Sequence, residues 1–274
     1  YLAKLLEGCQ VAVTRVGRKA AEGDTDLSVF DSVATLIKTV QPDYIFHLAA
    51  VSSVSHQYIL ENHQTICTGT IHILEAVKQV CPAAKVFISG SALQFKNDGQ
   101  PISEKNPFEA RDAYSLCRIQ SVLSARYYRS LGIRTYVGYF FNHDSPLRSE
   151  RHMTSKIAEA AKRIAAGSQE QLMIGDLEAT KEYTFAGDVV NAVWTLVNQE
   201  AVTEAVIGSG TGYSIADWLE VCFGMVGKNW RDHVVPDEQF VSGYRQLIAD
   251  PSLIRSLGWK PAVDFKQLAQ MMMQ

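Results

Sequence analysis

Tyr114 and Arg118 are the two residues of this chain whose types and spacing most directly suggest proton transfer. They lie four positions apart in the stretch from Asp112 to Arg118, whose pattern predicts the start of a helix running to about Leu131. Side chains at that spacing share one helix face, and a neighbouring cation favours the phenolate form of a tyrosine. The heptapeptide alone fits a solvated helix face better than a general acid or base, so the surrounding elements must decide between the two.

The elements around this pair alternate between strand and helix patterns. Apolar runs bounded by turn residues predict strands, and apolar positions three and four apart predict helices. Their alternation at this spacing predicts an α/β fold with a doubly wound parallel sheet covered by helices on both faces. The expected strands cover residues 10–15, 44–50, 85–91 and 135–140, and the expected helices cover 1–6, 28–40, 66–77 and 112–131.

The pattern changes beyond Phe141 from strands to loops and helices, which predicts a second and smaller C-terminal lobe. Apolar spacing predicts helices around residues 157–164 and 189–197. Ser214 and Asp217 have the spacing of a capping box ahead of a further apolar run.

Ligands of open α/β sheets bind in the crevice at the carboxyl ends of the strands. The residues that follow Ala50, Gly90 and Phe140 are expected to gather at that edge. Tyr114 is then expected on the rim of the crevice, where a proton-transferring group would reach a bound molecule.

Composition argues against several other classes of protein. The 274 residues are 47% hydrophobic and 20% charged, and a net charge of −3 with a pI near 6.2 gives no basic footprint for nucleic acid or an anionic membrane. No apolar run reaches the roughly 20 residues that span a bilayer. The five cysteines are scattered without Cys-x-x-Cys spacing, so we expect no disulfide framework, no metal site and a cytoplasmic location.

Five short blocks occur in one order along nearly the whole chain. They are Gln41 to Ala50, Gly69-Thr70, Tyr114 in a Tyr-x-x-x-Lys position, Phe141-Asn142-His143-x-x-Pro146, and Leu257 to Pro261. In this order they resemble the extended short-chain dehydrogenase/reductases of the NAD-dependent epimerase/dehydratase family, which modify nucleotide sugars. The fourth block, with residues 154–157 and 175–179, looks most like the members that act on GDP-mannose and on GDP-4-keto-6-deoxymannose.

The resemblance implies a Rossmann-like domain over residues 1–142 that binds NADP or NAD. It implies a substrate-binding lobe over 143–274, with segments around 180–210 returning to the first domain. A tyrosine in such enzymes moves a proton at a sugar hydroxyl while the nicotinamide carries the hydride. The implied partners are a nucleotide-sugar substrate and a second copy of the chain, paired through helices over 66–77 and 116–131.

Carried over position by position, the resemblance assigns roles to individual residues. The catalytic set is Tyr114, Arg118, Ser89 and Ser91; the cofactor set is Arg15, Asp26, Leu27, Ala49, Ala50, Tyr114 and Arg118; the substrate set is Asn142, Lys156 and Arg245. Arg15 ends an expected strand, where NAD-specific relatives often carry an acid for the ribose 2′-hydroxyl. A cation there suits the 2′-phosphate of NADP, and a solvated strand end fits the residue equally well.

Three positions depart from the pattern of the family. The catalytic Ser or Thr falls at Gly90, with Ser89 and Ser91 on either side, the glutamate of the dehydratases falls at Ala92, and the lysine falls at Arg118. Arginine keeps the positive charge but is never deprotonated in proteins, so it cannot relay a proton. Without a carboxylate at position 92, reduction or epimerisation at C4 of the sugar is favoured over 4,6-dehydration.

The glycine-rich loop that cradles a dinucleotide pyrophosphate is not among the printed residues. The spans between Arg15 and Asp26 and between Tyr244 and Asp250 are also short for the family, so we expect loop residues of a longer natural chain to be missing there. Two readings stay open: a nucleotide-sugar oxidoreductase, epimerase or dehydratase, and a non-catalytic dinucleotide-binding protein of the same fold with a regulatory or scaffolding role.

Overall fold

The computed structural model describes residues 1–17, 25–237, 239–240 and 242–274. Within these ranges the chain divides into two compact units. Unit 1 comprises Tyr1–Lys96, Glu104–Phe140 and Val193–Val206, and unit 2 comprises Asn97–Ser103, Phe141–Ala192 and Ile207–Gln274. Both units are built from helices and strands, and each has its own buried apolar core.

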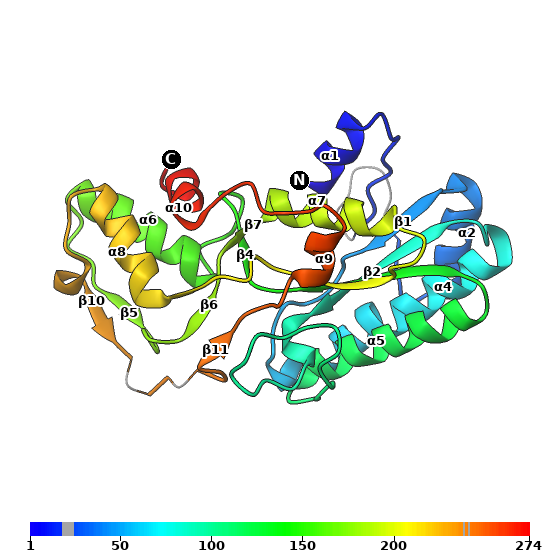
Figure 1. Ribbon diagram of the computed structural model, residues 1–274, viewed down its shortest axis with the longest axis horizontal. Helices are drawn as coiled ribbons and strands as arrows, with labels where there is room; N and C mark the ends of the chain where they lie inside the picture. The colour runs from blue at the N-terminus through cyan, green and yellow to red at the C-terminus, as the bar shows by residue number, and fades with distance from the viewer. Residues whose placement is uncertain (18–24, 238, 241) are drawn as a thin grey trace. The chain divides into compact units, whose positions relative to one another are not determined.

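Unit 1 is built on a four-stranded sheet with the order β1-β2-β3-β8 (Figure 1). The strands are β1 (Tyr44–His47), β2 (Lys85–Ser91), β3 (Arg134–Phe140) and β8 (Glu204–Ile207). β2 pairs in parallel with both β1 and β3, and its last residues, Gly90 and Ser91, lie opposite Tyr139 and Phe140. The predicted parallel α/β sheet is therefore confirmed.

Helices cover both faces of this sheet. They are α1 (Leu2–Gly8), α2 (Phe30–Val40), α3 (Ile59–Asn62), α4 (Gly69–Val80), α5 (Ala113–Ser130) and the last part of α7 (Ala186–Val197), with short turns η1 (His56–Tyr58), η2 (His63–Thr68) and η3 (Ala92–Gln94). Thr135 donates to the Ala125 carbonyl on α5, whereas the hydroxyl of its neighbour Tyr136 donates to the Gln199 carbonyl beyond α7. Since adjacent strand residues point to opposite faces, α5 and α7 lie on opposite sides of the sheet. On the α5 side, α4 packs between α2 and α5 (Figure 1).

Helix α5 begins where its capping residues place it. The Asp112 carboxylate accepts a hydrogen bond from the Ser115 amide at 2.8 Å, and the Ser115 hydroxyl accepts one from the Asp112 amide at 3.0 Å. This capping box satisfies amides that the first helical turn leaves without partners. Tyr114 is thereby fixed as the second residue of the helix.

Two details of the first domain differ from the sequence predictions. The predicted strand over residues 10–15 is wrong: Gln10 adopts a left-handed φ of 60°, and the Val11 amide bonds back to the Leu6 carbonyl of α1. This tight turn leads the chain back alongside α1. Residues 11–16 therefore pair with no strand among the described residues. Strand β1 ends at His47 rather than at Ala50. Residues 18–24, in one of the two spans expected to be short of loop residues, lie outside the described part of the chain.

Unit 2 consists of short strands and longer helices. Its strands are β4 (His143–Asp144), β5 (Leu172–Ile174), β6 (Thr180–Glu182), β7 (Thr184–Phe185), β9 (Gly212–Ser214), β10 (Val234–Pro236) and β11 (Gln246–Leu247), and its helices are α6 (Met153–Ala165), the first part of α7, α8 (Ile215–Met225), α9 (Ser252–Ser256) and α10 (Phe265–Met273), with a turn η4 (Trp230–Asp232). β6 pairs with β9 and β11, β5 with β10, and β4 with β7. The capping box predicted from Ser214 and Asp217 opens α8 as expected.

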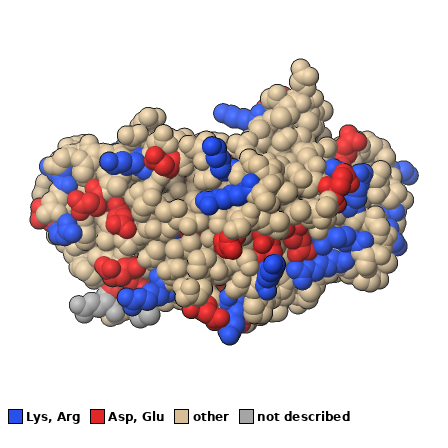
Figure 2. All heavy atoms as spheres, viewed as in Figure 1, with Lys and Arg blue, Asp and Glu red and all other residues tan. Residues whose placement is uncertain are grey.

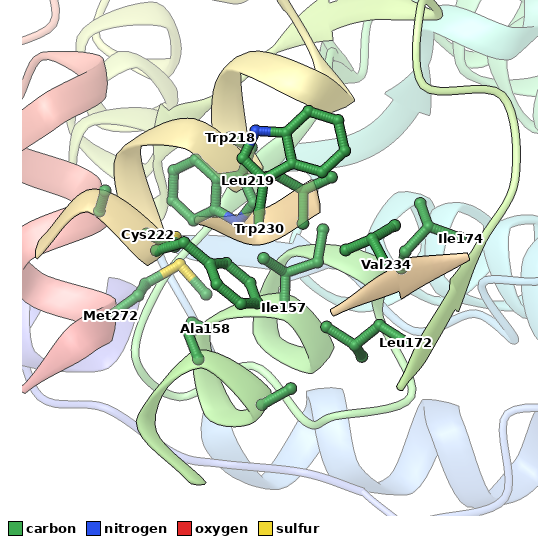
Figure 3. Packing of buried hydrophobic residues seen from close by; sticks show 14 of the residues in the cluster. Ile157, Ala158, Leu172, Ile174, Trp218, Leu219, Cys222, Trp230, Val234 and Met272 are labelled. Carbon is green, nitrogen blue, oxygen red and sulfur yellow. The ribbon is translucent and has the colours of Figure 1, made fainter. Parts of the chain in front are cut away.

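The core of unit 2 forms where α6, α8 and α10 meet β5 and β10 (Figure 3). Trp218 lies at its centre with 0% exposure, stacks on Tyr183 at a centroid distance of 5.0 Å and donates its indole N–H to the Thr154 carbonyl. Truncating a buried aromatic side chain of this size typically costs about 3–5 kcal/mol. Packing around Trp218 is therefore a large contribution to the stability of unit 2.

The surface carries both signs of charge. Figure 2 shows lysines and arginines intermixed with aspartates and glutamates over the visible face. Among the described residues, no helix has the length and apolar character needed to cross a membrane.

Glu204, the first residue of β8, ties three elements of unit 1 together. Its carboxylate accepts hydrogen bonds from Arg126 and Arg129 on α5 and from the Tyr139 hydroxyl on β3, the last at 2.6 Å. Burial by itself would raise the pKa of Glu204, but these hydrogen bonds outweigh burial and lower the pKa to about 2. The carboxylate is thus held in its charged form far into acid.

The lowered pKa of Glu204 predicts a pH-dependent part of the free energy of unfolding. A carboxyl whose pKa drops from 4.5 to about 2 on folding stabilises the native state above pH 4.5, by about 3 kcal/mol, and loses that contribution as pH falls through 2. Glu204→Gln should therefore lower the free energy of unfolding at pH 7, with the difference from wild type shrinking between pH 4.5 and 2. Urea unfolding across this range measures both, and an equal difference at pH 3 and pH 7 would contradict the assignment.

Candidate active site

Tyr114 and Arg118 lie on one face of α5, as their spacing predicts. The Arg118 guanidinium carbon is 5.0 Å from the centroid of the Tyr114 ring, a distance at which a cation is attracted to the aromatic face. Tyr114 is half-buried, and its hydroxyl makes no hydrogen bond to any residue within the described ranges. The phenol is therefore held in place through its ring while its oxygen stays available to a ligand.

Arg118 is a buried cation, with only 4% of its surface exposed. Its Nη1 donates to the Ser89 carbonyl at 2.5 Å and to the Ser89 hydroxyl at 2.8 Å. The Ser89 hydroxyl in turn donates to the His47 carbonyl at 3.1 Å. Because a buried charge is costly unless it is hydrogen-bonded, these contacts fix the end of β2 against β1 on one side and α5 on the other. Ser89 thus orients Arg118 and has its own hydroxyl proton engaged.

Ser91 has a different environment from Ser89. Its hydroxyl accepts a hydrogen bond from the Leu93 amide at 3.2 Å, and its amide donates to the Gln94 side chain, so that it caps the turn η3. Within the described ranges, the hydroxyl proton of Ser91 has no acceptor. Ser91 is therefore the candidate serine whose O–H can be donated to a bound molecule.

Gly90 stands where the resemblance expects a catalytic Ser or Thr, and packing explains the glycine. A Cβ at this position would lie 2.6 Å from Cδ1 of the Tyr139 ring. Carbon atoms do not approach that closely without a shift of the chain, so Tyr139 occupies the space that a side chain at position 90 would need. The departure at Gly90 reflects this cross-strand contact.

The floor beneath Tyr114 is apolar. Its ring and Ala50 pack against a buried cluster of Ile66, Cys67 and Cys117. Burial raises the pKa of both thiols, so these cysteines are inert packing groups rather than nucleophiles.

His47 lies close to this region but is not an acid or base at neutral pH. Burial, followed by the charge of Arg118, lowers the pKa of His47 to about 4. Its Nε2 and the Nε of Arg118 are buried with no hydrogen-bond partner among the described residues. His47 is therefore a neutral core histidine, as its place in an apolar strand suggests.

The residues assigned to a dinucleotide lie at several places in unit 1. Ala49 and Ala50 follow β1; Ala49 is exposed and Ala50 is half-buried. Asp26 accepts hydrogen bonds from both the amide and the hydroxyl of Ser28. The carbonyl of Leu27 lies 2.8 Å from Nδ1 of His72 on α4.

Arg15 forms an ion pair with Glu7 of α1 at 2.6 Å, and both side chains are at least half exposed. Since residues 11–16 form no strand here, Arg15 does not end the strand on which its assignment rested. Its contact with a ribose phosphate stays a prediction.

The residues assigned to the substrate lie in unit 2. The Asn142 backbone carbonyl accepts from the Thr184 amide, while its side-chain Oδ1 is buried and has no partner in the described part of the chain. Lys156 donates from Nζ to the Met173 carbonyl at 3.1 Å. The backbone of Arg245 bonds to Thr180 at the start of β6.

Lys181 was not singled out by the sequence, and it is the most perturbed cation of unit 2. Its ammonium lies 5.4 Å from the Tyr183 ring centroid, near Asp144 and Arg148. Burial, only partly offset by the charge of Asp144, lowers the pKa of Lys181 to about 8. A lysine on a short strand gives no sign of burial in the sequence, because the burial comes from residues far along the chain.

Solved structures of other proteins share the fold of this chain. It matches RMD from Pseudomonas aeruginosa, in a structure complexed with NADPH, with a TM-score of 0.85 and 22% identity over 100% of this chain and 94% of that one. It matches dTDP-glucose 4,6-dehydratase from Bacillus anthracis, in complex with NAD, with a TM-score of 0.86 and 15% identity over 100% and 91%. The fold is that of the NAD-dependent epimerase/dehydratase branch of the short-chain dehydrogenase/reductases.

The family follows from the sequence comparison. The chain belongs to the GDP-mannose 4,6 dehydratase family, which it matches over residues 14–272. GDP-mannose 4,6 dehydratase 1 of Arabidopsis thaliana is 33% identical over 257 residues, covering 90% of this chain and 71% of the relative. GDP-mannose 4,6 dehydratase 2 of the same plant is also 33% identical, covering 90% and 69%. The resemblance drawn from the short blocks is confirmed.

Proposed function

We propose that this protein is an NADP- or NAD-dependent oxidoreductase that acts at C4 of a GDP-mannose-type nucleotide sugar. The observation that carries the proposal is Tyr114, whose hydroxyl is available to a ligand and whose ring centroid lies 5.0 Å from the guanidinium carbon of the buried Arg118. Membership of the GDP-mannose 4,6 dehydratase family supports the substrate class. The cytoplasm stays the predicted location.

The described residues of unit 1 are compatible with a nicotinamide dinucleotide. Ala49 and Ala50 follow β1 with small side chains, Ala49 exposed and Ala50 half-buried, and the half-buried Tyr114 offers an unengaged hydroxyl. Asp26 and Leu27 would hold the adenosine, and Arg15 the 2′-phosphate if the cofactor is NADP. When bound, the nicotinamide supplies a hydride acceptor or donor, which is chemistry that no amino-acid side chain provides. The NADPH and NAD complexes of the fold neighbours support this choice.

Tyr114 handles the proton of the reaction. During oxidation at C4 its phenolate takes the proton from the sugar hydroxyl, and during reduction its phenol returns a proton to the C4 oxygen. Arg118 holds the Tyr114 ring in place and does not itself exchange a proton. Ser91 donates its O–H to the C4 oxygen and orients it.

The reaction stops at C4 in this proposal. Elimination of water across C5 and C6 requires a base at the sugar C5, and position 92, where the resemblance expects that carboxylate, holds a buried alanine. Transfer of a hydride and a proton at C4 needs only the cofactor and Tyr114. Reduction of a 4-keto sugar or epimerisation at C4 is therefore favoured over 4,6-dehydration.

Unit 2 supplies the residues for the nucleotide. Asn142 presents a buried and unpaired side-chain oxygen, and Lys156, Arg245 and Lys181 provide cations for the two phosphates. Because the pKa of Lys181 is about 8, its share of the positive charge declines above that pH.

Tyr114→Phe tests the proton-transfer role. The substitution keeps the ring on its apolar floor and removes only the hydroxyl, so turnover should fall about 10²–10⁴-fold while NADP(H) binding stays nearly unchanged. Arg118→Lys should lower turnover about tenfold, because an ammonium lacks the planar guanidinium that packs on the Tyr114 ring while its Nη1 bonds to Ser89. The measurement pairs a turnover assay on a panel of GDP-hexoses and their 4-keto forms with fluorescence titration of NADPH.

Two outcomes would count against the proposal. Full turnover in Tyr114→Phe would remove the phenol from the mechanism. Wild-type protein that binds NADPH but converts no sugar nucleotide in the panel would favour the non-catalytic, dinucleotide-binding reading. In that reading the contact of Arg118 with Ser89 has a structural role only.

We also propose that two copies of the chain pair through α4 and α5. Ile71 on α4 is 45% exposed, and on α5 Leu116, Leu123 and Tyr127 are 39%, 53% and 61% exposed along one stripe at helical spacing. Exposed apolar stripes of this kind mark association surfaces. Leu123→Lys should convert a dimer into a monomer at micromolar concentration in analytical ultracentrifugation, whereas the charge-adding control Gln270→Lys at an exposed position of α10 should leave the dimer intact. A wild-type protein that sediments only as a monomer would refute the pairing.

A further inference from the structure

Gly90 and Tyr139 form a matched pair across the sheet, opposite each other in the β2–β3 register. The ring of Tyr139 fills the space beside Gly90, since a Cβ there would meet its Cδ1 and Cε1 at 2.6 and 3.2 Å. The flanking residues of Gly90 are Ser89 and Ser91, which contact Arg118 and cap η3 respectively. The position of the Tyr139 ring therefore limits where both serines can lie.

The Tyr139 ring is held from several sides. Its hydroxyl donates to Glu204 at 2.6 Å and accepts from Arg126 at 3.2 Å. Its ring packs edge-on against Phe95 at a centroid distance of 4.8 Å and lies 6.1 Å from Phe108. Tyr139 is 0% exposed, so neither end of the side chain is free to move without disturbing these contacts.

We propose that Tyr139 is a positioning residue for the proton-transfer site. Glu204 and Arg126 fix its hydroxyl, its ring presses on the glycine of β2, and this contact holds the Ser89 carbonyl and hydroxyl where Arg118 Nη1 reaches both. Arg118 in turn stays under the Tyr114 ring. The inference rests on the proposed function for its kinetic consequence, but the contact between Ser89 and Arg118 can be measured without any turnover.

Tyr136 provides a matched control on the same strand. Its side chain is also buried, and its hydroxyl also donates to one acceptor, the Gln199 carbonyl at 2.8 Å. It points to the α7 face, however, and has no part in the contact with Gly90. Tyr136→Phe and Tyr139→Phe therefore both remove a hydroxyl from a buried ring of the same strand, although the Tyr139 hydroxyl bonds to charged groups and the Tyr136 hydroxyl to a neutral carbonyl.

The first readout is kinetic. Tyr139→Phe should lower kcat about tenfold with KM within twofold of wild type, because one buried hydrogen bond to a charged group is lost while the ligand-binding residues are unchanged. Tyr136→Phe should leave both constants unchanged, even though it also removes a hydrogen bond from a buried ring of β3. An equal fall in kcat for both variants would overturn the positioning role.

The second readout is independent of activity. Hydrogen exchange of the Arg118 side-chain N–H groups, followed by ¹⁵N NMR, should speed up about tenfold in Tyr139→Phe and not in Tyr136→Phe, because only the former loosens Ser89. Unchanged exchange rates at Arg118 in Tyr139→Phe would overturn the inference, whether or not the protein converts a substrate. If exchange speeds up in Tyr139→Phe as expected but the wild-type protein shows no turnover, the proposed function alone is wrong.

A double substitution distinguishes disruption of the contact between residues 90 and 139 from unfolding of the whole protein. Gly90→Ala should disrupt the site on its own, since the new Cβ meets the Tyr139 ring. Gly90→Ala combined with Tyr139→Leu should recover folding, because the smaller side chain makes room. Exchange at Arg118 should nevertheless stay fast in this double variant, because the side chain that holds Ser89 in place is gone. Gly90→Ala that folds and keeps slow exchange with Tyr139 intact would contradict the pairing.

Discussion

The buried contact between the Arg118 guanidinium and Ser89 is the constraint on which the candidate site depends. A cation with 4% exposure needs hydrogen-bond acceptors, and the acceptors available to it are the carbonyl and hydroxyl of one residue at the end of β2. Satisfying the charge therefore fixes the helix that carries Tyr114 against the strand that carries Ser91. Because the charge lies one helical turn below the phenol, the requirement that stabilises the fold is also the one that favours proton transfer.

The departures from the family pattern have different physical meanings. At position 90, the absence of a hydroxyl follows from a tyrosine on the next strand that fills the space, and Ser91 can supply an O–H close by. At position 118, one nitrogen of the guanidinium bonds to both the carbonyl and the hydroxyl of Ser89. At position 92, an alanine stands where the resemblance expects a carboxylate. Its absence disfavours elimination of water across C5 and C6 of the sugar in the proposed reaction. The sum of these features supports a retuned site within the GDP-mannose 4,6 dehydratase family.

Local patterns predicted most of the architecture, and long-range contacts account for what they missed. Helix α5 was predictable because its capping box and apolar spacing lie within 18 consecutive residues. The strand expected over residues 10–15 was wrong because a strand needs a neighbour to pair with, and the left-handed turn at Gln10 sends the chain back to α1 instead. Lys181 and Tyr139 were missed for a common reason: their importance comes from burial and from partners distant in sequence, such as Asp144 for the first and Glu204 for the second.

The central claim is that hydride and proton exchange occur at C4 of a GDP-hexose. The most direct test uses deuterium as a tracer in both directions, with GDP-mannose labelled at C4 plus NADP⁺, and with GDP-4-keto-6-deoxymannose plus NADPH labelled at its transferable hydride. Mass spectrometry of the sugar and the cofactor then reports the fate of the label. The account predicts that deuterium passes between the sugar C4 and the cofactor in at least one direction. Because epimerisation returns the same hydride to C4, NMR of the sugar also reports the configuration at that carbon. Label that stays in place in both experiments with the C4 configuration unchanged, in a protein that demonstrably binds the cofactor, would contradict it.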